Sequence, residues 1–349
     1  MLQGGTVSAP AASGIEFGPG SGGPLVVRAP NHLGDVVMAL GALRDRGGDI
    51  VVVSSLVPLL EMAGLQGRII PFRRGASGWF QVMEQLRTGR YAKGILLSGS
   101  FSAALLFRAG GVSHLRGMSG DGRDRLLAEA VPRSRFRGNH RVNNLRLLAG
   151  LPPIDPLEPG RIVPPGAVVE HWQERLPPGD GPLVGLFPGS NAPARRWEAG
   201  RFAALGRLLV DRGARVVVLG APNEAHLTGE VAAGAPGIMD LGGRTDLPGL
   251  AAVLSICDLF VTNDTGPMHL AAAVGTPTIT LWGSSDPQEV HPLGARDERV
   301  HGASLPCAPC KKNVCPRSGP GTLLPHARNE CMNLIETASV MAAVERLLG

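Results

Sequence analysis

The stretch that decides the fold is residues 261–277, Val-Thr-Asn-Asp-Thr-Gly-Pro-Met-His-Leu-Ala-Ala-Ala-Val-Gly-Thr-Pro. It predicts a strand, a polar turn and a helix opened by Pro267, because a helix start does not need the N–H that proline lacks. Such a turn directs free amide groups and the positive end of the helix to one point, which suits an anion such as phosphate. An ordinary strand-to-helix turn capped by Asp264 or Thr265 is the alternative.

Three further segments place polar groups after predicted strands. Gly34 and Asp35 follow the apolar run that begins at Leu25. A strand over residues 183–187 leads into a small-residue loop with a hydroxyl, an amide and two guanidinium groups, which suit a pyrophosphate: Ser190, Asn191, Arg195 and Arg196. A strand over 215–219 leads to Glu224, whose carboxylate suits a ribose hydroxyl. Because ligands of open parallel sheets gather at the carboxyl ends of strands, these four ends predict one cleft.

The composition suits a soluble α/β protein with two domains. The chain has 349 residues, of which 44% are hydrophobic and 18% charged, and no apolar run reaches the roughly 18 residues that a membrane span needs. We expect residues 1–24, rich in Gly, Ser, Ala and Pro, to be a flexible lead and not a signal peptide.

The positive charge is concentrated in one region. The net charge is +5 and the pI about 9.3, and residues 109–146 hold eight arginines against three carboxylates. That region suits an anionic acceptor, an anionic membrane surface or nucleic acid, and a solvated helical face is the plain alternative. Nucleic acid is the weakest of these, because 4% aromatic residues with a single Tyr offer few stacking surfaces.

Apolar runs alternate with helical patterns along the chain, which is typical of a parallel sheet wound with helices. We expect strands near 25–28, 50–54, 68–71 and 94–97, and again near 183–187, 215–219, 238–241, 259–262 and 278–282. A proline-dense stretch over 151–182 predicts the linker. The predicted domains are 25–160 and 161–335, followed by a helix over 336–349 that packs outside or crosses back to the first domain.

The order and spacing of these motifs resemble the lipopolysaccharide heptosyltransferases of glycosyltransferase family 9, over about residues 24–349. Residues 98–102, residues 114–123 and the terminal cysteine cluster are most similar to the heptosyltransferase II branch. The resemblance implies an α/β fold of GT-B type, with two Rossmann-like parallel-sheet domains facing across a cleft. It places the acceptor in the first domain and the nucleotide sugar in the second.

The resemblance implies an inverting, metal-independent transfer of L-glycero-D-manno-heptose from ADP-heptose to the inner core of lipopolysaccharide, with no cofactor. The enzyme would be cytoplasmic and would visit the cytoplasmic face of the inner membrane transiently to meet its lipid-linked acceptor. No nucleic acid is expected as a partner.

The resemblance also implies roles for individual residues. Asp35 matches the general base of the family. The implied donor contacts are Ser190, Asn191, Arg195, Arg196, Glu224, Asp264, Thr265, Gly266 and His269. The suggested acceptor contacts are Gly34, Arg74, Ser100, Arg116 and Arg123. The family usually has Lys where this chain has Arg195, so the charge is kept while the reach and geometry change.

Several alternatives stay open. The chain could be a family 9 transferase with another nucleotide sugar or acceptor, or a nucleotide-sugar-binding protein without turnover. Asp35 also suits a first-turn helix carboxylate, and His269 a hydrogen-bonded structural histidine. The pattern of Cys307, Cys310, Cys315 and Cys331 fits a zinc or iron-sulfur site, or a structural loop without metal.

Overall fold

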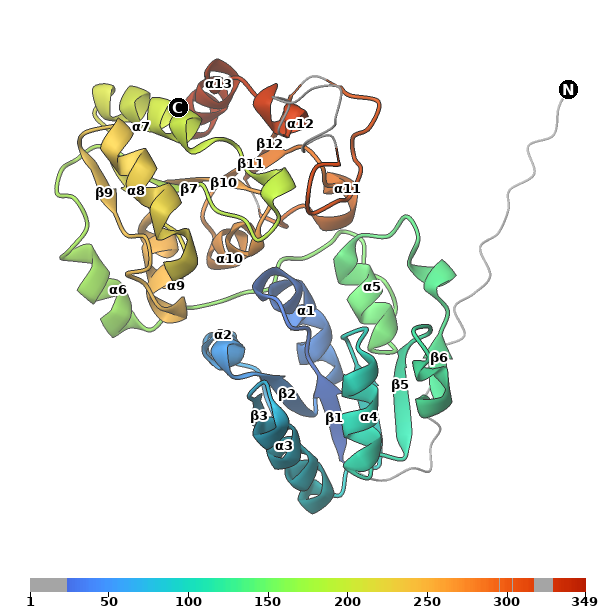
Figure 1. Cartoon of the computed structure of the whole chain (residues 1–349). Coiled ribbons are helices and arrows are strands. Elements are labelled where there is room, and N and C mark those ends of the chain that lie inside the picture. The colour runs from blue at the N-terminus through green and yellow to red at the C-terminus, as the bar shows by residue number, and fades with distance from the viewer. Residues whose placement is uncertain (1–23, 295, 303, 317–328) are drawn as a thin grey trace, which may run out of the picture.

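Strands and helices alternate along the chain and build two separate parallel sheets, shown in Figure 1. The computed structural model describes residues 24–294, 296–302, 304–316 and 329–349. The lead predicted for residues 1–24 therefore lies, except for its last residue, outside the described part of the chain. Two six-stranded parallel sheets confirm the predicted GT-B type of α/β fold.

The first sheet has the strand order β3-β2-β1-β4-β5-β6, and all its pairs are parallel. Because the chain leaves β1 in one direction and returns to β4 on its other side, the switch point of the topology lies between these two strands. The strands are β1 (Leu25–Arg28), β2 (Asp49–Val53), β3 (Ile69–Phe72), β4 (Lys93–Leu96), β5 (His114–Met118) and β6 (Glu129–Val131).

The second sheet repeats this topology with the order β12-β11-β10-β7-β8-β9, again all parallel. Its switch point lies between β7 and β10. β7, β10 and β11 are buried along their whole length, as expected for strands covered on both faces. The strands are β7 (Leu183–Phe187), β8 (Arg215–Val218), β9 (Ile238–Asp240), β10 (Leu259–Asn263), β11 (Thr278–Trp282) and β12 (Asp297–His301).

Helices cover both faces of each sheet. In the N-terminal lobe, which is the first sheet with its helices, α1 packs with α5 and α3 packs with α4. These helices are α1 (Leu33–Arg46), α2 (Val57–Met62), α3 (Ala76–Gly89), α4 (Phe101–Ala109) and α5 (Arg141–Leu148).

The second sheet and its helices form the C-terminal lobe. Its helices are α6 (Gly166–Gln173), α7 (Ala199–Asp211), α8 (Ala225–Gly234), α9 (Leu247–Ile256), α10 (Gly266–Val274), α11 (Pro287–Val290), α12 (Glu330–Asn333) and α13 (Thr337–Leu348). The last helix, α13, packs against α7 and the second sheet, so it covers the outside of its own lobe and does not cross back.

The two lobes are in direct contact. α1 packs against α10 and α2 against α9, and one hydrophobic cluster runs from Val27 in β1 to Leu270 in α10. The linker also joins them, since Ile162 N–H donates to the carbonyl of Ala273 and Val163 N–H to that of Met62. The contact between α1 and α10 brings the first turns of these two helices together.

Candidate functional site

The turn between β10 and α10 opens into a helix whose start has no side-chain cap. Thr265 is the N-cap residue, and within the described residues neither its hydroxyl nor the Asp264 carboxylate accepts from the first-turn amides. The alternative of an ordinary capped turn is therefore not what the structure contains. The first turn of α10 keeps its positive end open at the carboxyl edge of the second sheet.

Arg195 and Asp264 meet at this helix start. Arg195 Nη1 lies 3.0 Å from Asp264 Oδ2. Within the described part of the chain, the buried Arg195 Nε has no hydrogen-bond partner, and Asp264 Oδ2 has this ion pair but no aligned hydrogen bond. Burial raises the pKa of Asp264 above its usual value, while Arg195 and the Ser285 hydroxyl oppose this shift. Buried polar atoms without partners are rare in native proteins, and here they mark a place where a polar ligand fits.

The loop after β7 is held rigidly beside this pair. Asn263, fully buried at the end of β10, donates from Nδ2 to the carbonyl of Pro188 and accepts the N–H of Trp197. Arg196 Nε donates to the carbonyl of Ser190 at 2.8 Å, so this guanidinium anchors the loop. The Ser190 hydroxyl contacts the carbonyl of Asp264 at 3.4 Å, and Asn191 is exposed at the tip.

Glu224 lies against the same loop, at the carboxyl end of β8. It is buried, and its Oε2 accepts the N–H of Ala221 at 3.1 Å. Gly189 passes directly over the carboxyl group, because a Cβ at this position would lie 2.3–2.5 Å from Glu224 Cδ, Oε1 and Oε2. Glycine is therefore required here, because any side chain at position 189 would collide with the carboxyl group of Glu224.

Asp35 lies in the first turn of α1, on the opposite lobe. Its side chain is 30% exposed, and Arg141 Nε lies 3.5 Å from Asp35 Oδ1. The neighbouring Gly34 meets the ring of His269 in α10, and a Cβ on Gly34 would lie 2.7 Å from its Cδ2. Burial lowers the pKa of His269 to about 3, so this ring is neutral where the lobes meet.

A second histidine joins the lobes beside this point. The ring of His140 caps α5 by accepting the N–H of Val142 at Nδ1, so its Nε2 carries the proton and donates to the carbonyl of His291 at 3.1 Å. Burial and the nearby His291 lower the pKa of His140 to about 4. Arg141 directly follows His140 in the sequence. The hydrogen bond from His140 to the His291 carbonyl therefore also positions the Arg141 guanidinium, which contacts Asp35.

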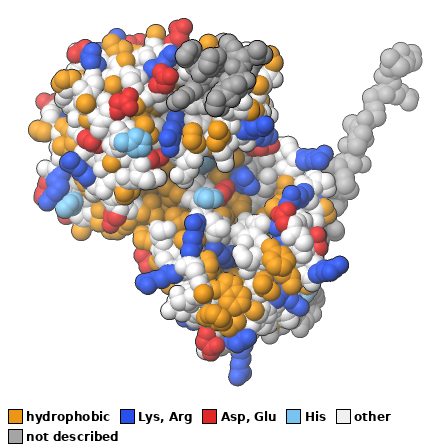
Figure 2. Space-filling view, viewed as in Figure 1, with side chains coloured by type: hydrophobic (Ala, Val, Ile, Leu, Met, Phe, Trp, Pro, Cys, Tyr) orange, Lys and Arg blue, Asp and Glu red, His pale blue; other side chains and the backbone are white. Residues whose placement is uncertain are grey.

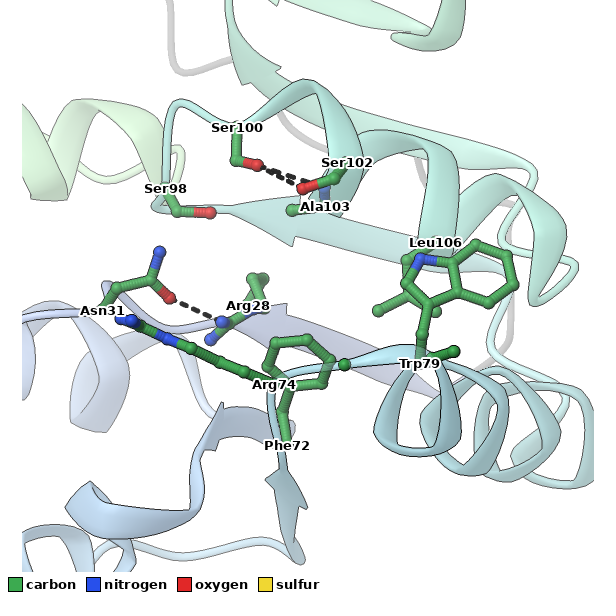
Figure 3. Close-up of a pocket in the computed structure, with 12 residues that line it drawn as sticks. Arg28, Asn31, Phe72, Arg74, Trp79, Ser98, Ser100, Ser102, Ala103 and Leu106 are labelled. Carbon is green, nitrogen blue, oxygen red and sulfur yellow. Dashed lines mark hydrogen bonds between the residues drawn. The ribbon is translucent and has the colours of Figure 1, made fainter.

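The N-terminal lobe has its own cavity of about 440 Å³ at the carboxyl ends of β1, β3 and β4. Figure 3 shows Arg28 and Arg74 on one side, Ser98 and Ser100 on the other, and Trp79 at one end. Burial and the charge of Arg74 lower the pKa of Arg28 to about 10. Among the described residues the buried Ser98 Oγ has no hydrogen-bond partner. Two guanidinium groups and one hydroxyl without a partner suit an anionic sugar.

The cavity contains two of the suggested acceptor residues, Arg74 and Ser100, and it adds Arg28, Asn31 and Ser98, which sequence reasoning missed. A signal for Arg28 was present, because an arginine that ends an otherwise apolar strand must find partners at the strand's carboxyl end. Arg28 does so by donating to Asn31 Oδ1 and to the carbonyls of Ala29 and Val51.

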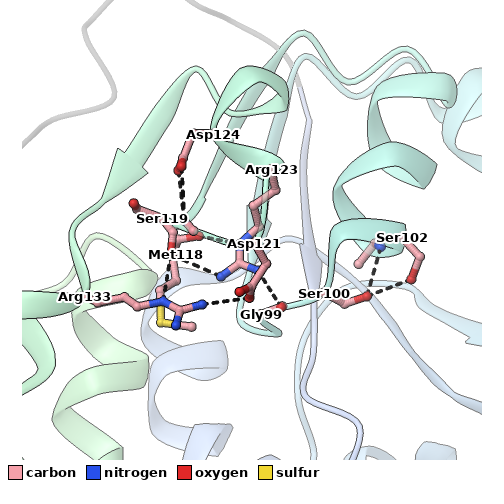
Figure 4. A network of polar contacts seen from close by, with 11 residues as sticks. Gly99, Ser100, Ser102, Met118, Ser119, Asp121, Arg123, Asp124 and Arg133 are labelled. Carbon is pink, nitrogen blue, oxygen red and sulfur yellow. Dashed lines mark hydrogen bonds and ion pairs between the residues drawn. The ribbon is translucent and has the colours of Figure 1, made fainter.

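Arg116 and Arg123 do not line the cavity. Arg116 is buried and donates to the carbonyls of Leu147 and Leu148 and to Glu129. Arg123 is fully buried and, as Figure 4 shows, its guanidinium donates to carbonyls that include Met118 and Gly99. In this arrangement neither guanidinium is free to contact an acceptor. Arg123 instead anchors the Gly99 backbone between Ser98 and Ser100, which line the cavity.

The four clustered cysteines are not disulfide-bonded. Burial raises the pKa of Cys331, and the thiols at 307, 310 and 315 lie near enough to add to this shift. No group of three or more His, Cys, Asp or Glu side chains in the described residues has an arrangement suited to a metal ion.

The described residues also include no helix with the length and apolar character needed to cross a bilayer.

Comparison with known proteins places this geometry in context. The family model for "Glycosyltransferase family 9 (heptosyltransferase)" matches residues 79–319. Lipopolysaccharide heptosyltransferase 2 of Salmonella typhimurium is 27% identical over 297 residues, which are 77% of this chain and 85% of the relative. Lipooligosaccharide heptosyltransferase 2 of Haemophilus influenzae is 26% identical over 77% of this chain and 86% of its own length. The solved structure of Escherichia coli ADP-heptose lps heptosyltransferase II superposes with a TM-score of 0.76 and 24% identity, covering 93% of this chain and 98% of that one.

Proposed function

The chain belongs to glycosyltransferase family 9 (heptosyltransferase), and we propose that it transfers L-glycero-D-manno-heptose from ADP-heptose to the inner core of lipopolysaccharide. The names of the relatives support transfer of a heptose and this class of acceptor, and the name of the similar Escherichia coli structure includes ADP-heptose. The observation that carries the proposal is the ion pair between the partly exposed Arg195 and the buried Asp264, with Arg195 Nε unpartnered in the described structure, at the open start of α10. Asp35 of the other lobe lies in the helix that packs against α10.

The proposed reaction is a single displacement with inversion. An acceptor hydroxyl oxygen attacks the anomeric carbon of the heptose, the bond from that carbon to the β-phosphate oxygen breaks, and ADP leaves. Asp35 takes the proton of the attacking hydroxyl as the new glycosidic bond forms. Arg141, 3.5 Å from the carboxylate, orients it toward the cleft between the lobes.

Negative charge grows on the departing ADP and must be stabilised. In our proposal Arg195, the amides at the start of α10 and the Ser190–Asn191 loop supply this stabilisation. Arg196 holds that loop in place through the Ser190 carbonyl. Glu224 receives the ribose, and Asp264 and His269 contact the sugar side of the donor. Since the guanidinium supplies positive charge at the leaving group, we propose that no metal is needed. An unchanged transfer rate with excess chelator tests this.

The cavity of the N-terminal lobe is proposed to receive the acceptor. Arg28 and Arg74 would pair with its anionic groups and Ser98 and Ser100 with its hydroxyls. Asn31 lines the cavity, and Asp35 follows it four residues later in the sequence. Gly34 contributes close backbone approach. The acceptor is lipid-linked, so we propose that the enzyme works at the cytoplasmic face of the inner membrane.

One assay tests the proposal. Purified protein is offered ADP-heptose with heptosylated and with unheptosylated core acceptors, and the products are identified by mass. We expect one added heptose on one of the two acceptors. In Asp35→Asn we expect donor affinity to be kept and transfer to fall by roughly 10²–10⁴-fold. A product only with another nucleotide sugar would move the chain to a different donor, and binding without any product would make it an inactive binding protein.

A further inference from the structure

Large apolar side chains are exposed side by side on α3 and α4. Phe80 is 59% exposed, Phe101 46% and Leu105 43%, and we call these three residues the α3–α4 patch. α3 and α4 pack against each other on one face of the first sheet. Figure 2 shows hydrophobic side chains gathered over these two helices, with Lys and Arg side chains around them. Exposed apolar residues grouped in this way mark an interaction surface.

The exposed face of α4 combines apolar side chains with a cation. Phe101, Leu105 and Arg108 are spaced by four and three residues, so an aromatic ring, an aliphatic group and a cation lie along one exposed helix face. On α3, Phe80 packs edge-to-face on Trp79 with ring centroids 5.6 Å apart. Aromatic and aliphatic groups beside arginine are typical of helices that lie in a membrane interface.

The charge of the segment that carries the α3–α4 patch is mostly positive. Residues 68–109 contain seven basic residues and one acidic residue, Glu84. The basic residues are Arg68, Arg73, Arg74, Arg87, Arg90, Lys93 and Arg108. Such a surface complements an anionic bilayer, where each nearby cation adds binding free energy.

The α3–α4 patch borders the acceptor cavity. Trp79 of α3 and Leu106 of α4 line that cavity, and each is the direct sequence neighbour of a patch residue. Figure 3 shows these two side chains together at one end of the cavity. A molecule anchored in a bilayer beneath the patch would therefore meet the cavity without leaving the membrane.

From these observations we infer that the α3–α4 patch docks the enzyme on an anionic lipid bilayer, with Phe80, Phe101 and Leu105 entering the headgroup region and the surrounding arginines pairing with lipid phosphates. The inference rests on the proposed function, because the enzyme needs to bind a membrane only if its acceptor is lipid-linked. It assigns the docking to helices α3 and α4 and not to the arginine-rich residues 109–146, where Arg116, Arg123 and Arg146 are buried.

The test measures binding of the full chain to sedimented vesicles, either of phosphatidylcholine alone or with about one third phosphatidylglycerol. We expect the unmodified protein to bind the anionic vesicles more tightly. The triple variant Phe80→Ser, Phe101→Ser and Leu105→Ser should lose about tenfold or more of that binding. Arg73→Gln should lower binding to anionic vesicles only. The matched control is Leu208→Ser with Val314→Ser, two exposed apolar residues of the C-terminal lobe that are 36% and 64% exposed.

Equal binding by the protein and its triple variant would overturn the inference, as would an equal loss in the control. A dimer in lipid-free solution that the triple variant abolishes would overturn it too, by showing that a second copy covers the patch. Thermal melting checks that the variants fold, and Phe80→Ser alone serves if the triple variant does not.

Transfer assays separate this inference from the proposed function. With a deacylated, water-soluble acceptor the triple variant should be as active as the unmodified protein, and with acceptor embedded in anionic vesicles it should be about tenfold slower. No transfer by the unmodified protein to either acceptor would defeat the proposed function and leave the vesicle-binding result to stand by itself. Equal rates for both proteins on embedded acceptor would defeat the docking role.

Discussion

The two lobes have the same strand order but different chemistry at their switch points. In the C-terminal lobe, between β7 and β10, opposite charges are paired, with the partly exposed Arg195 beside the buried Asp264. In the N-terminal lobe, between β1 and β4, like charges of Arg28 and Arg74 face an open cavity. Because the Asp264 carboxylate fixes the orientation of the Arg195 guanidinium, this site suits a ligand of fixed shape. An open basic cavity tolerates a larger and more variable anionic ligand.

The largest expected effect comes from removing the Arg195 charge in the C-terminal lobe. Arg195→Gln removes the cation at the leaving group and leaves Asp264 buried without its partner, so kcat/KM should fall by roughly 10²–10³-fold. Arg195→Lys keeps the charge and should recover part of the rate. Steady-state kinetics with a thermal melt for each variant measure this, and a loss of less than threefold in Arg195→Gln would contradict the proposed donor site.

The N-terminal side should respond more weakly and through the acceptor alone. Arg74→Gln removes one charge-assisted contact from the cavity, so the KM for a water-soluble acceptor should rise about tenfold while the KM for ADP-heptose stays unchanged. The adjacent Arg73 is exposed and does not line the cavity, which makes Arg73→Gln the matched control. Equal shifts in both variants would show that general charge, and not this cavity, holds the acceptor.

The contact between the lobes can be tested with two glycines of α1. A Cβ on Gly34 would lie 2.7 Å from His269 Cδ2, whereas one on Gly41 meets nothing within 4 Å. Gly34→Ala should therefore cost about 1–3 kcal/mol of unfolding free energy and slow transfer. Gly41→Ala should be neutral or stabilise by up to about 1 kcal/mol. Denaturant titration compares them, and equal stabilities would mean that the lobes separate easily in solution.

The smallest effect concerns pH. The folded protein lowers the pKa of His140 to about 4 from the usual 6.5, so between these values the unfolded chain binds a proton that the folded chain excludes. Stability should therefore fall as the pH drops from about 6.5 toward 4. His269, with its pKa lowered to about 3, adds to the same trend, and the neighbouring His291 and Arg141 contribute to the lowered pKa of His140.

His140→Asn keeps a side chain that caps α5 and loses the bond to His291. Its stability should depend less steeply on pH over this range, as measured by melting temperature at several pH values. A slope identical to that of the unmodified protein would place the pH dependence elsewhere.

Much of the architecture follows from local pattern. The predicted strands 183–187 and 278–282 match β7 and β11 at both ends, because continuous apolar runs flanked by Pro and Gly leave little choice. β5 was missed because His114 and Arg116 interrupt its apolar pattern, and β6 because it has only three residues. β12 was missed because its Asp, Glu and Arg do not resemble a strand.

The predicted site residues also divide into those that local sequence pattern placed correctly and those that it did not. Residues in strand-to-helix turns, such as Asp35, Ser190 and Asp264, are found at the carboxyl edges of the sheets. Their chemical roles stay predictions. Arg116 and Arg123 were suggested as acceptor contacts on charge alone, and the structure buries them. Burial of an arginine depends on carbonyl partners distant in sequence, such as Leu148 for Arg116, and no local sequence pattern predicts these partners.

By itself the sequence determined the alternation of strands and helices, the family, and which strand-to-helix turns carry polar and charged groups, because each depends on neighbours within a few residues. Only the tertiary structure decided that Arg195 is held by Asp264, that Gly34 meets His269, and that Arg28 and Arg74 share one cavity. Those contacts join segments up to hundreds of residues apart, and they exist because two parallel sheets bring the ends of their strands to a common edge.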